Sequence, residues 1–353
     1  MGHVVVIGAG QAGSSCVAKL RNSGFEGKIT LIGAEAVPPY QRPPLSKAYL
    51  LGDMALERLY LRPESFYPDH GIDLMLGTTV DSIDPAAQTV RVNGGDMPYD
   101  DLVLTTGSFP RRLPASIGGD LDGVHVVRDL SDVDTMGPRF AKGARVLIVG
   151  GGYIGLEAAS VAAKLGLQVT LVEMGDRILQ RVAAPQTSDF FRDLHAAHGV
   201  TIREGVGLER LIGDTHVTGA QLSDGSELAV DFVIVGVGIG AATALADAAG
   251  IVNDNGIMTD THGRTSAPHV WAAGDCASFP YRIGRIRLES VPHAIDQAEL
   301  VAENIMGADK EYVAKPWFWS DQYDVKLQIA GLNMGYDRVI TRRTDADSVA
   351  FWY

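Results

Sequence analysis

Two glycine-rich motifs of nearly the same form constrain most strongly what this chain can fold into. The first reads VVVIGAGQAG at residues 4–13, and the second reads VLIVGGGYIG at residues 146–155. In each motif, a run of aliphatic residues typical of a strand buried on both faces leads into the glycine spacing G-x-G-x-x-G. The motif glycines are Gly8, Gly10 and Gly13 in the first copy and Gly150, Gly152 and Gly155 in the second.

Each glycine of this spacing has its own physical role. The first permits a tight turn, the second lets the backbone approach a pyrophosphate, and the third lets the helix pack closely on the strand. The helix that follows directs free N–H groups and the positive end of its dipole at the phosphates. We therefore predict two dinucleotide sites, one per motif. The alternative is two ordinary strand–turn–helix units whose glycines serve packing alone.

An acidic residue follows each motif at the spacing expected for a ribose ligand. Glu35 ends the stretch KITLIGAE and Glu173 lies in QVTLVEMG, each roughly twenty residues beyond the last motif glycine. A carboxylate at that place can accept a hydrogen bond from a ribose hydroxyl. A chain that holds two dinucleotides is expected to pass electrons between them, so the sequence favours an oxidoreductase.

Charge and hydropathy exclude two classes of partner. The net charge of −13 and the pI of about 5.1 argue against nucleic acid, which requires a basic face. The longest apolar run, residues 232–246, is shorter than the roughly 18 residues that a membrane helix needs. The first strand begins almost at Met1, without the regions of a signal peptide. We expect a cytoplasmic protein that binds neither nucleic acid nor membrane.

The cysteines and histidines indicate neither a disulfide nor a metal site. Cys16 and Cys276 are the two cysteines, and neither belongs to a C-x-x-C pair. A structural disulfide is not expected in a reducing compartment, and a dithiol relay for disulfide reduction is missing. The nine histidines do not cluster as zinc ligands would, so no metal is predicted.

The order of segments indicates a discontinuous first domain. The first unit lacks its last strand until HVWAAGDC, residues 269–276, and a complete second unit lies in between. Asp275 follows that strand, at the end where doubly wound folds hold ligands, although it could also be a helix N-cap. We predict an α/β fold with two Rossmann-like dinucleotide-binding domains, at residues 1–109 with 239–315 and at 110–238, followed by a partial α+β domain at 316–353. The ending SVAFWY reads as mid-strand, so this last domain is expected to be truncated or rebuilt.

Seven segments, in this order, resemble one known family: VVVIGAGQAG, PYQRPPLSK, LVLTTGS, VLIVGGGYIGLE, WAAGDC, SVPHAIDQA and PWFWSDQY. The chain resembles, over essentially its whole length, the FAD-dependent, NADH-using ferredoxin reductases of bacterial oxygenase systems, the putidaredoxin reductase-like family. The resemblance implies a glutathione-reductase-like fold, with FAD at the first motif and NADH at the second. Ala241 and Ala242 depart from the family, in which a proline and a polar residue are common there.

The resemblance also implies the residues of both cofactor sites. For FAD they are Gly8, Gly10, Gly13, Glu35, Arg42, Lys47, Thr106, Gly107, Asp275, Val291 and Trp319. For NAD they are Gly150, Gly152, Tyr153, Ile154, Gly155, Glu173, Arg177 and Gly238. Glu173 would repel the 2′-phosphate of NADPH, which favours NADH, whereas Arg177 nearby could welcome that phosphate.

Lys47 and Glu157 are the residues that the resemblance places at the reaction centre. An ion pair between them would be partly desolvated and could respond to the charge of the flavin. The alternative for Glu157 is an early-helix acid that faces the helix dipole. NADH would deliver a hydride to the flavin, which would release single electrons, with the protein supplying geometry and electrostatics.

The expected electron acceptor is an acidic [2Fe-2S] ferredoxin, and through it an oxygenase of the cytochrome P-450 or Rieske type. Arg282, Arg285 and Arg287 form a basic cluster that could dock it or could be a solvated hairpin turn. Two alternatives remain: a flavoprotein NADH oxidase, and a redox signalling protein like the apoptosis-inducing factors. Ser46 and Lys47 stand where a redox cysteine would be placed in an oxidase or disulfide reductase, which argues against the first.

Overall fold

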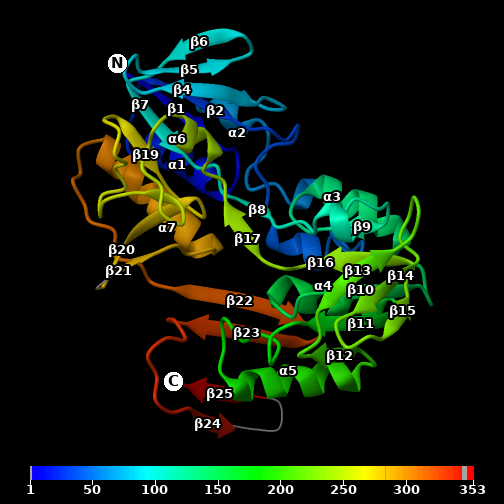
Figure 1. Cartoon of the computed structure of the whole chain (residues 1–353). Helices are drawn as coiled ribbons and strands as arrows, with labels where there is room; N and C mark the ends of the chain where they lie inside the picture. The colour runs from blue at the N-terminus through cyan, green and yellow to red at the C-terminus, as the bar shows by residue number, and fades with distance from the viewer. Residues whose placement is uncertain (1, 283, 344–347) are drawn as a thin grey trace. The chain divides into compact units, whose positions relative to one another are not determined.

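The computed structural model describes residues 2–282, 284–343 and 348–353 (Figure 1). Their contacts divide the chain into two compact units, each of which returns to segments that are distant in sequence. Unit 1 comprises Met1–Gln41, Leu56–Phe109 and Gly240–Phe318, and unit 2 comprises Arg42–Ala55, Pro110–Ile239 and Trp319–Tyr353. The domain boundaries expected from the sequence stay a prediction, because contacts group residues by proximity and not by the ligand they bind.

Unit 1 is built on a five-stranded parallel sheet whose central strand carries the first glycine motif. Its order is β19 (Val270–Ala272), β7 (Asp101–Leu104), β1 (His3–Ile7), β2 (Lys28–Ile32) and β3 (Ile72–Met75). Val4 lies opposite Ile29 of β2 on one side and Asp101 of β7 on the other, and all four pairings in this sheet are parallel. Their carboxyl ends therefore meet at one edge of the sheet.

Successive residues of β1 face two different halves of the core. Val4 and Val6 pack with α1 (Gln11–Asn22) and α7 (Val291–Ile305) in one buried cluster. Val5 and Ile7 belong to a second cluster on the opposite face. Because both faces are covered, the strand is apolar throughout, as its sequence predicts.

Smaller elements complete unit 1. They are the antiparallel sheet β4 (Val80–Asp84), β5 (Thr89–Val92), β6 (Gly95–Pro98); the sheet β18 (Ile257–Met258), β20 (Ala277–Tyr281), β21 (Gly284–Ile286); and the helices α2 (Phe66–Asp69) and α6 (Ala244–Ala248). The chain leaves unit 1 within β8 (Ser108–Pro110) and returns within β17 (Ile239–Ala241), and these two short strands pair with each other.

Unit 2 repeats the parallel arrangement around the second glycine motif. The order of its main sheet is β12 (Thr201–Glu204), β11 (Gln168–Glu173), β10 (Arg145–Val149), β16 (Phe232–Val235) and β9 (Val124–His125). The helices of this unit are α3 (Leu130–Met136), α4 (Tyr153–Lys164) and α5 (Pro185–Ala197), and a three-stranded sheet is formed by β13 (Leu208–Ile212), β14 (Gly219–Leu222) and β15 (Glu227–Ala229). Leu147 and Val149 of the motif strand share a buried cluster with Ala220 and Leu222 of β14.

Two hairpins end the chain. The strand β22 (Trp317–Gln322) pairs with β23 (Val325–Ala330), and β24 (Ile340–Arg343) pairs with β25 (Val349–Trp352). From Trp319 onward these strands cluster with unit 2, as do residues 42–55, which carry the short 3-10 helix Pro43–Ser46. Among the helices of the described ranges, none has both the length and the hydropathy needed to cross a membrane.

Candidate functional site

The first glycine motif forms a cradle between β1 and α1. Gly8 has φ +114, and a Cβ there would lie 2.1 Å from the carbonyl oxygen of Thr105. A Cβ on Gly13 would lie 2.1 Å from the carbonyl oxygen of Gly8. A Cβ on Gly10, in contrast, would have no atom of the chain within 4 Å. The first and third glycines therefore allow close packing, and the second leaves room for a ligand, as a pyrophosphate requires.

The second motif has the same geometry in unit 2. Gly150 has φ +109, and a Cβ there would lie 2.4 Å from the carbonyl oxygen of Gly236. A Cβ on Gly155 would lie 2.1 Å from the carbonyl oxygen of Gly150, whereas one on Gly152 would have nothing within 4 Å. Packing accounts for the first and third glycines, whereas the open space before Gly152, as before Gly10, leaves room for a ligand. Both motifs fit a dinucleotide.

Other predicted FAD residues gather at the carboxyl ends of the unit 1 strands. Glu35 lies just after β2, and its Oε2 accepts a hydrogen bond from the Tyr40 hydroxyl at 2.5 Å. Asp275 follows β19, and its Oδ2 accepts from Ser108 Oγ at 2.9 Å. Thr106 follows β7 and donates its hydroxyl to the carbonyl of Ala242 at 2.6 Å. The sheet topology thus brings these side chains to the edge that holds the glycine cradle.

The helix α7 adds a buried donor to the same edge. Gln297 is 1% exposed, and its Oε1 accepts from the amide of Gly274, next to Asp275, at 2.9 Å. Its Nε2 is buried and has no hydrogen-bond partner among the described residues. Val291 begins this helix, which Ser290 caps by accepting from the amide of His293. An unsatisfied buried amide and a helix N-terminus beside a phosphate cradle fit a ligand with many acceptors, such as FAD.

The predicted NAD residues lie together in unit 2. Glu173 ends β11, and its two carboxylate oxygens accept from the amides of Gly151 and Gly175, each at 2.7 Å. This places an oriented carboxylate beside the second cradle. Arg177 donates to Ser188 Oγ at 2.6 Å. That contact holds the guanidinium toward α5, which reduces the weight of Arg177 as a ligand for a 2′-phosphate.

Three further predicted NAD residues border the same cradle. Tyr153 and Ile154 form the first turn of α4, directly after Gly152. Ile154 is 41% exposed, while burial raises the pKa of Tyr153. Gly238 lies in the loop after β16 with φ +97, two residues beyond the Gly236 carbonyl that packs on Gly150.

The ion pair between Lys47 and Glu157 is present. Lys47 Nζ lies 2.8 Å from Glu157 Oε2, with side chains 18% and 3% exposed, and also donates to the Pro43 carbonyl at 3.3 Å. Ser46 Oγ donates to the same Oε2 at 2.6 Å, and Ser320 Oγ donates to Oε1 at 2.7 Å. Glu157 is therefore buried and paired with Lys47, an arrangement that an acid merely facing the helix dipole does not require, and its place at the reaction centre stays a prediction.

Not all predicted FAD residues cluster with the first cradle. Arg42, Lys47 and Trp319 belong to unit 2, where Arg42 Nη1 donates to the carbonyl of Arg128 at 2.8 Å. Trp319 lies in β22, on the face opposite to Ser320. The sequence did not predict Ser46 or Ser320 as ligands of Glu157. Three consecutive polar residues, Ser320 to Gln322, in an otherwise aromatic strand, PWFWSDQY, were a signal that could have been used.

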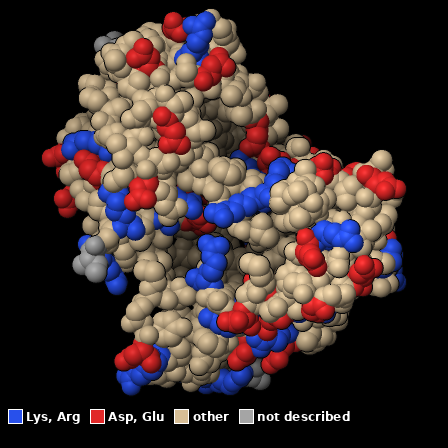
Figure 2. Space-filling view, in the orientation of Figure 1, with Lys and Arg blue, Asp and Glu red and all other residues tan. Residues whose placement is uncertain are grey.

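The basic cluster near α7 is less available than its sequence suggests. Arg285 donates to the carbonyl of Ser278, and the side chain of Arg287 is 10% exposed and paired with Glu289. Arg282 is exposed and lies over the ring of Tyr281. On the face drawn in Figure 2, basic side chains lie among acidic ones over most of the surface. Of the three arginines, Arg282 is the one that remains open to a partner.

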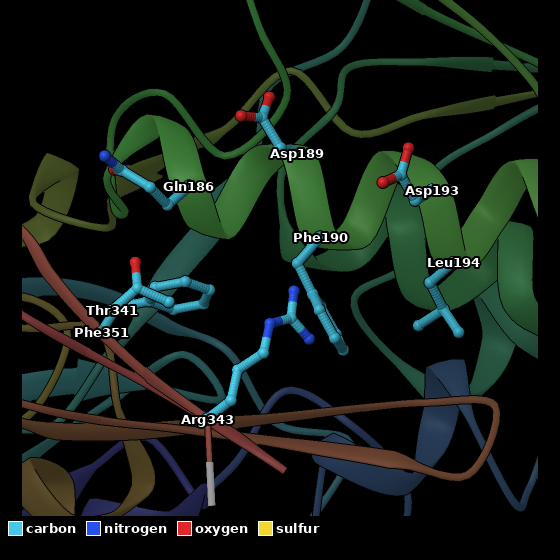
Figure 3. Close-up of a pocket in the computed structure, with 8 residues that line it drawn as sticks. All are labelled: Gln186, Asp189, Phe190, Asp193, Leu194, Thr341, Arg343 and Phe351. Atoms are coloured by element: carbon cyan, nitrogen blue, oxygen red, sulfur yellow. The ribbon is translucent and has the colours of Figure 1, made fainter. Parts of the chain in front are cut away.

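A pocket of about 360 Å³ lies outside the predicted sites (Figure 3). It is lined by Gln186, Asp189, Phe190, Asp193, Leu194, Thr341, Arg343 and Phe351. Figure 3 shows the Arg343 side chain extending from the C-terminal hairpin toward α5, beside Phe190. None of these residues belongs to a glycine cradle or to the group around Glu157, so we assign the pocket no cofactor.

Both cysteines are buried free thiols. Burial raises the pKa of Cys16 to about 12 and also raises that of Cys276. A thiol of this kind stays protonated and is a poor nucleophile. Within the described ranges, no group of three or more His, Cys, Asp or Glu side chains is arranged to hold a metal.

The fold and the two cradles define a class, the oxidoreductases that hold two dinucleotides on paired Rossmann-like folds. Residues 2–298 match the pyridine nucleotide-disulphide oxidoreductase family, and residues 317–353 match the reductase C-terminal family. The chain belongs to the pyridine nucleotide-disulphide oxidoreductase family, and within it to the ferredoxin reductases. It is an FAD- and NAD(H)-dependent oxidoreductase.

Similar proteins agree on this branch of the family. A ferredoxin–NAD(P)(+) reductase of a Sphingomonas species is 46% identical over 345 residues, which cover 96% of this chain and 83% of the relative. Putidaredoxin reductase of Pseudomonas putida is 42% identical, with 96% and 82% covered. The crystal structure of the covalent putidaredoxin reductase–putidaredoxin complex matches with a TM-score of 0.94 at 41% identity, covering 97% of this chain and 84% of that one.

Proposed function

We propose that the chain transfers electrons from NADH, through FAD, to a [2Fe-2S] ferredoxin that supplies an oxygenase of the cytochrome P-450 or Rieske type. The observation that carries the proposal is the pair of equivalent glycine cradles, with an acid beside each and, on the helix of the second, a buried Glu157 that pairs with Lys47. The named acceptors of its relatives, a ferredoxin and putidaredoxin, supply the class of partner.

In this proposal the first cradle binds FAD and the second binds NADH. Gly10 leaves space for the FAD pyrophosphate, Glu35 accepts from the adenosine ribose, and Asp275 accepts from the ribityl hydroxyls. FAD, when bound, supplies the acceptance of a hydride and its release as single electrons. The amide of Val291 and the positive end of the α7 dipole would stabilise negative charge on the flavin ring.

Glu173 and the second cradle select and orient the nucleotide. Its carboxylate is fixed by two backbone amides, so it is ready to accept from the 2′-hydroxyl of NADH. A 2′-phosphate at that place would meet a negative charge that two backbone amides hold in position. This disfavours NADPH.

Lys47 and Glu157 set the electrostatics of the reaction centre. The ammonium of Lys47 is held by the Glu157 carboxylate and by the Pro43 carbonyl, so its position is fixed before the nucleotide arrives. A fixed ammonium in a partly buried site stabilises negative charge more than a solvated one does. No side chain of the chain has to act as a nucleophile in this scheme.

An NADH oxidase or a disulfide reductase would need a reactive thiol. Ser46 occupies the relevant position, where its hydroxyl is committed to Glu157, and both cysteines are buried with raised pKa values. A signalling flavoprotein would bind NADH without fast turnover by a ferredoxin. A cytoplasmic location is part of the proposal, in keeping with the cytoplasmic supply of NADH.

The test is NADH-driven reduction of cytochrome c by the purified, FAD-loaded protein, with and without a [2Fe-2S] ferredoxin from the same source. We expect a rate that depends strongly on the ferredoxin and that falls with NADPH in place of NADH. If NADH bleaches the flavin but the ferredoxin does not increase the rate, the proposed ferredoxin partner is wrong and the signalling alternative is favoured. If NADH does not bleach the flavin, the proposal that NADH is the hydride donor is wrong as well.

A further inference from the structure

A continuous line of polar side chains ends at the carboxylate of Glu157. It starts at Tyr323, whose hydroxyl lies 3.0 Å from His195 Nδ1, and continues from His195 Nε2 to Gln322 Oε1 at 2.8 Å. Gln322 Nε2 lies 3.2 Å from Ser320 Oγ, which lies 2.7 Å from Glu157 Oε1. His195, Gln322 and Ser320 are each 0% exposed, and all members belong to unit 2.

The elements that carry these residues explain the arrangement. Ser320 and Gln322 are two apart on β22, so strand alternation points both side chains to the same buried face. Glu157 projects from α4 and His195 from α5. The line therefore joins β22, the first strand of the two hairpins that end the chain, to the helix that follows the second glycine motif.

Every hydrogen bond in the line has a fixed direction. Gln322 Oε1 can only accept, so His195 must carry its proton on Nε2. Burial lowers the pKa of His195, which keeps the ring neutral, so its Nδ1 accepts and the Tyr323 hydroxyl donates. Gln322 Nε2 can only donate, so the Ser320 oxygen accepts from it and the Ser320 hydroxyl donates its hydrogen bond to Glu157. All four donors point toward the carboxylate.

The second carboxylate oxygen receives its donors from the other side. Ser46 Oγ and Lys47 Nζ both reach Glu157 Oε2, at 2.6 and 2.8 Å, while Ser320 reaches Oε1. Hydrogen bonds to both oxygens fix the plane of the Glu157 carboxyl group. Because Glu157 is buried and accepts from three donors, its side chain has little freedom to rotate. The orientation of Glu157 in turn fixes Lys47.

The line is unsuited to carrying protons. A proton relay needs groups that accept and release a proton in turn, as hydroxyls and imidazoles do. The amide of Gln322 interrupts such a relay, because its nitrogen donates without accepting and its oxygen accepts without donating. Because its oxygen only accepts and its nitrogen only donates, the Gln322 amide fixes the direction of the hydrogen bonds to His195 and Ser320.

We propose that Ser320 and Gln322 are positioning residues for the reductase reaction: by a one-way line of hydrogen bonds anchored at His195 and Tyr323, they hold Glu157, and through it Lys47, in the orientation used during reduction by NADH. The inference rests on the proposed function, in which Lys47 and Glu157 lie at the reaction centre. It gives the C-terminal segment, through Ser320 and Gln322, a role in positioning the side chains of the site.

The kinetic test measures flavin reduction by NADH in a stopped-flow instrument, in the FAD-loaded full chain. Ser320→Ala should lower the limiting rate about tenfold, the effect of losing one hydrogen bond to a charged group, while the dissociation constant of NAD+ stays within about twofold. Ser320→Thr keeps the hydroxyl and should restore most of the rate. A purely structural role would lower the unfolding midpoint without this split between rate and binding.

The direction of the line has its own variant and its own matched control. Gln322→Glu keeps an acceptor for His195 but removes the donor to Ser320, so it should slow reduction at least as much as Ser320→Ala. Gln328→Glu makes the same change on the exposed face of β23 and should leave the rate unchanged. Equal rates in wild type, Ser320→Ala and Gln322→Glu would overturn the inference, whereas failure of wild type itself to be reduced would overturn the proposed function.

A readout independent of turnover is the tautomer of His195, from nitrogen NMR of protein labelled at histidine. Wild type should show a neutral ring protonated at Nε2. In Gln322→Met, which lacks the acceptor, this preference should be lost while Gln328→Met leaves it intact. A ring protonated at Nδ1 in the wild type would contradict the direction of the whole line.

Discussion

The two glycine cradles differ in what holds the acid beside them, although their backbones do the same work. In both, the third glycine lies against the carbonyl of the first, with 2.1 Å to a Cβ in each case. In the first cradle, Glu35 is approached by a side chain, the hydroxyl of Tyr40. In the second, Glu173 is held by two backbone amides, Gly151 and Gly175.

The difference matches what each site has to do. Two amides grip Glu173 in a fixed position, which suits discrimination between two nucleotides that come and go. The helices differ as well: α4 has the buried Glu157, whereas the buried polar residues of α1 are Ser14 and Ser15. The buried ion pair therefore accompanies the cradle assigned to the mobile substrate, whereas the helix of the cradle assigned to the resident cofactor buries only neutral polar side chains.

The largest expected effect comes from filling either cradle. Gly13→Ala and Gly155→Ala each place a Cβ against backbone that cannot move aside, so each should destabilise its unit by about 3 kcal/mol or lose it entirely. Gly13→Ala should abolish the absorbance of bound FAD. Gly155→Ala should keep the yellow colour and lose reduction by NADH.

Controls for these substitutions lie in the same units. Gly95 has no positive φ and no neighbour closer than 3.8 Å to an added Cβ, and Gly137 has none within 4 Å. Alanine at either should change neither flavin content nor reduction. If Gly155→Ala lost FAD and Gly13→Ala kept it, the assignment of cofactors to cradles would be reversed.

A smaller effect is expected from two buried imidazoles, one in each unit. Burial lowers the pKa of His293 in unit 1 and of His125 in unit 2 to about 4. The unfolded chain therefore binds more protons than the folded one between about pH 6.5 and 4, so the free energy of unfolding falls as the pH falls through this window. Each ring contributes at most about 3 kcal/mol to the fall.

Urea unfolding at pH 7, 5.5 and 4.5 measures this loss. His125→Phe should remove the contribution of His125 to the pH dependence of the free energy of unfolding. His293→Gln should likewise remove the contribution of His293. His216 is exposed, so His216→Gln should leave the curve as it is. A wild-type stability that stays constant from pH 7 to 4.5 would show that neither ring is held neutral by the fold.

The fold was largely predictable because its signals are local. A run such as VVVI followed by spaced glycines encodes strand, turn and helix within about ten residues, and the order of such units implies the interrupted first sheet. The predicted Lys47–Glu157 contact, in contrast, came from resemblance. Nothing in the spacing of residues 47 and 157 alone brings them together.

The group around Glu157 shows what the sequence could not supply. Ser320 lies 163 residues from Glu157, and His195 lies 127 residues from Gln322. Such bonds depend on which helix packs against which strand, and a serine or glutamine in a strand carries no mark of its future partner. Alternation predicts that Ser320 and Gln322 share a face, but only tertiary structure makes that face a buried polar one.

The smallest effect, and the one that addresses the difference between the cradles most directly, is expected at the two acids. Glu173→Ala removes the charge that opposes a 2′-phosphate, so the preference for NADH over NADPH, measured as the ratio of kcat/KM values, should narrow about tenfold. Glu35→Ala is the matched change in the other cradle; it should weaken FAD retention and leave the nucleotide ratio unchanged. Arg177 donates to Ser188 and is therefore not expected to bind the 2′-phosphate of NADPH in the Glu173→Ala variant. The change in the ratio then reports the loss of the Glu173 charge alone. An unchanged ratio in Glu173→Ala would mean that the two hydrogen bonds to the carboxylate support the turns at Gly151 and Gly175 and do not determine the choice of nucleotide. The contrast between the cradles would then be one of folding alone.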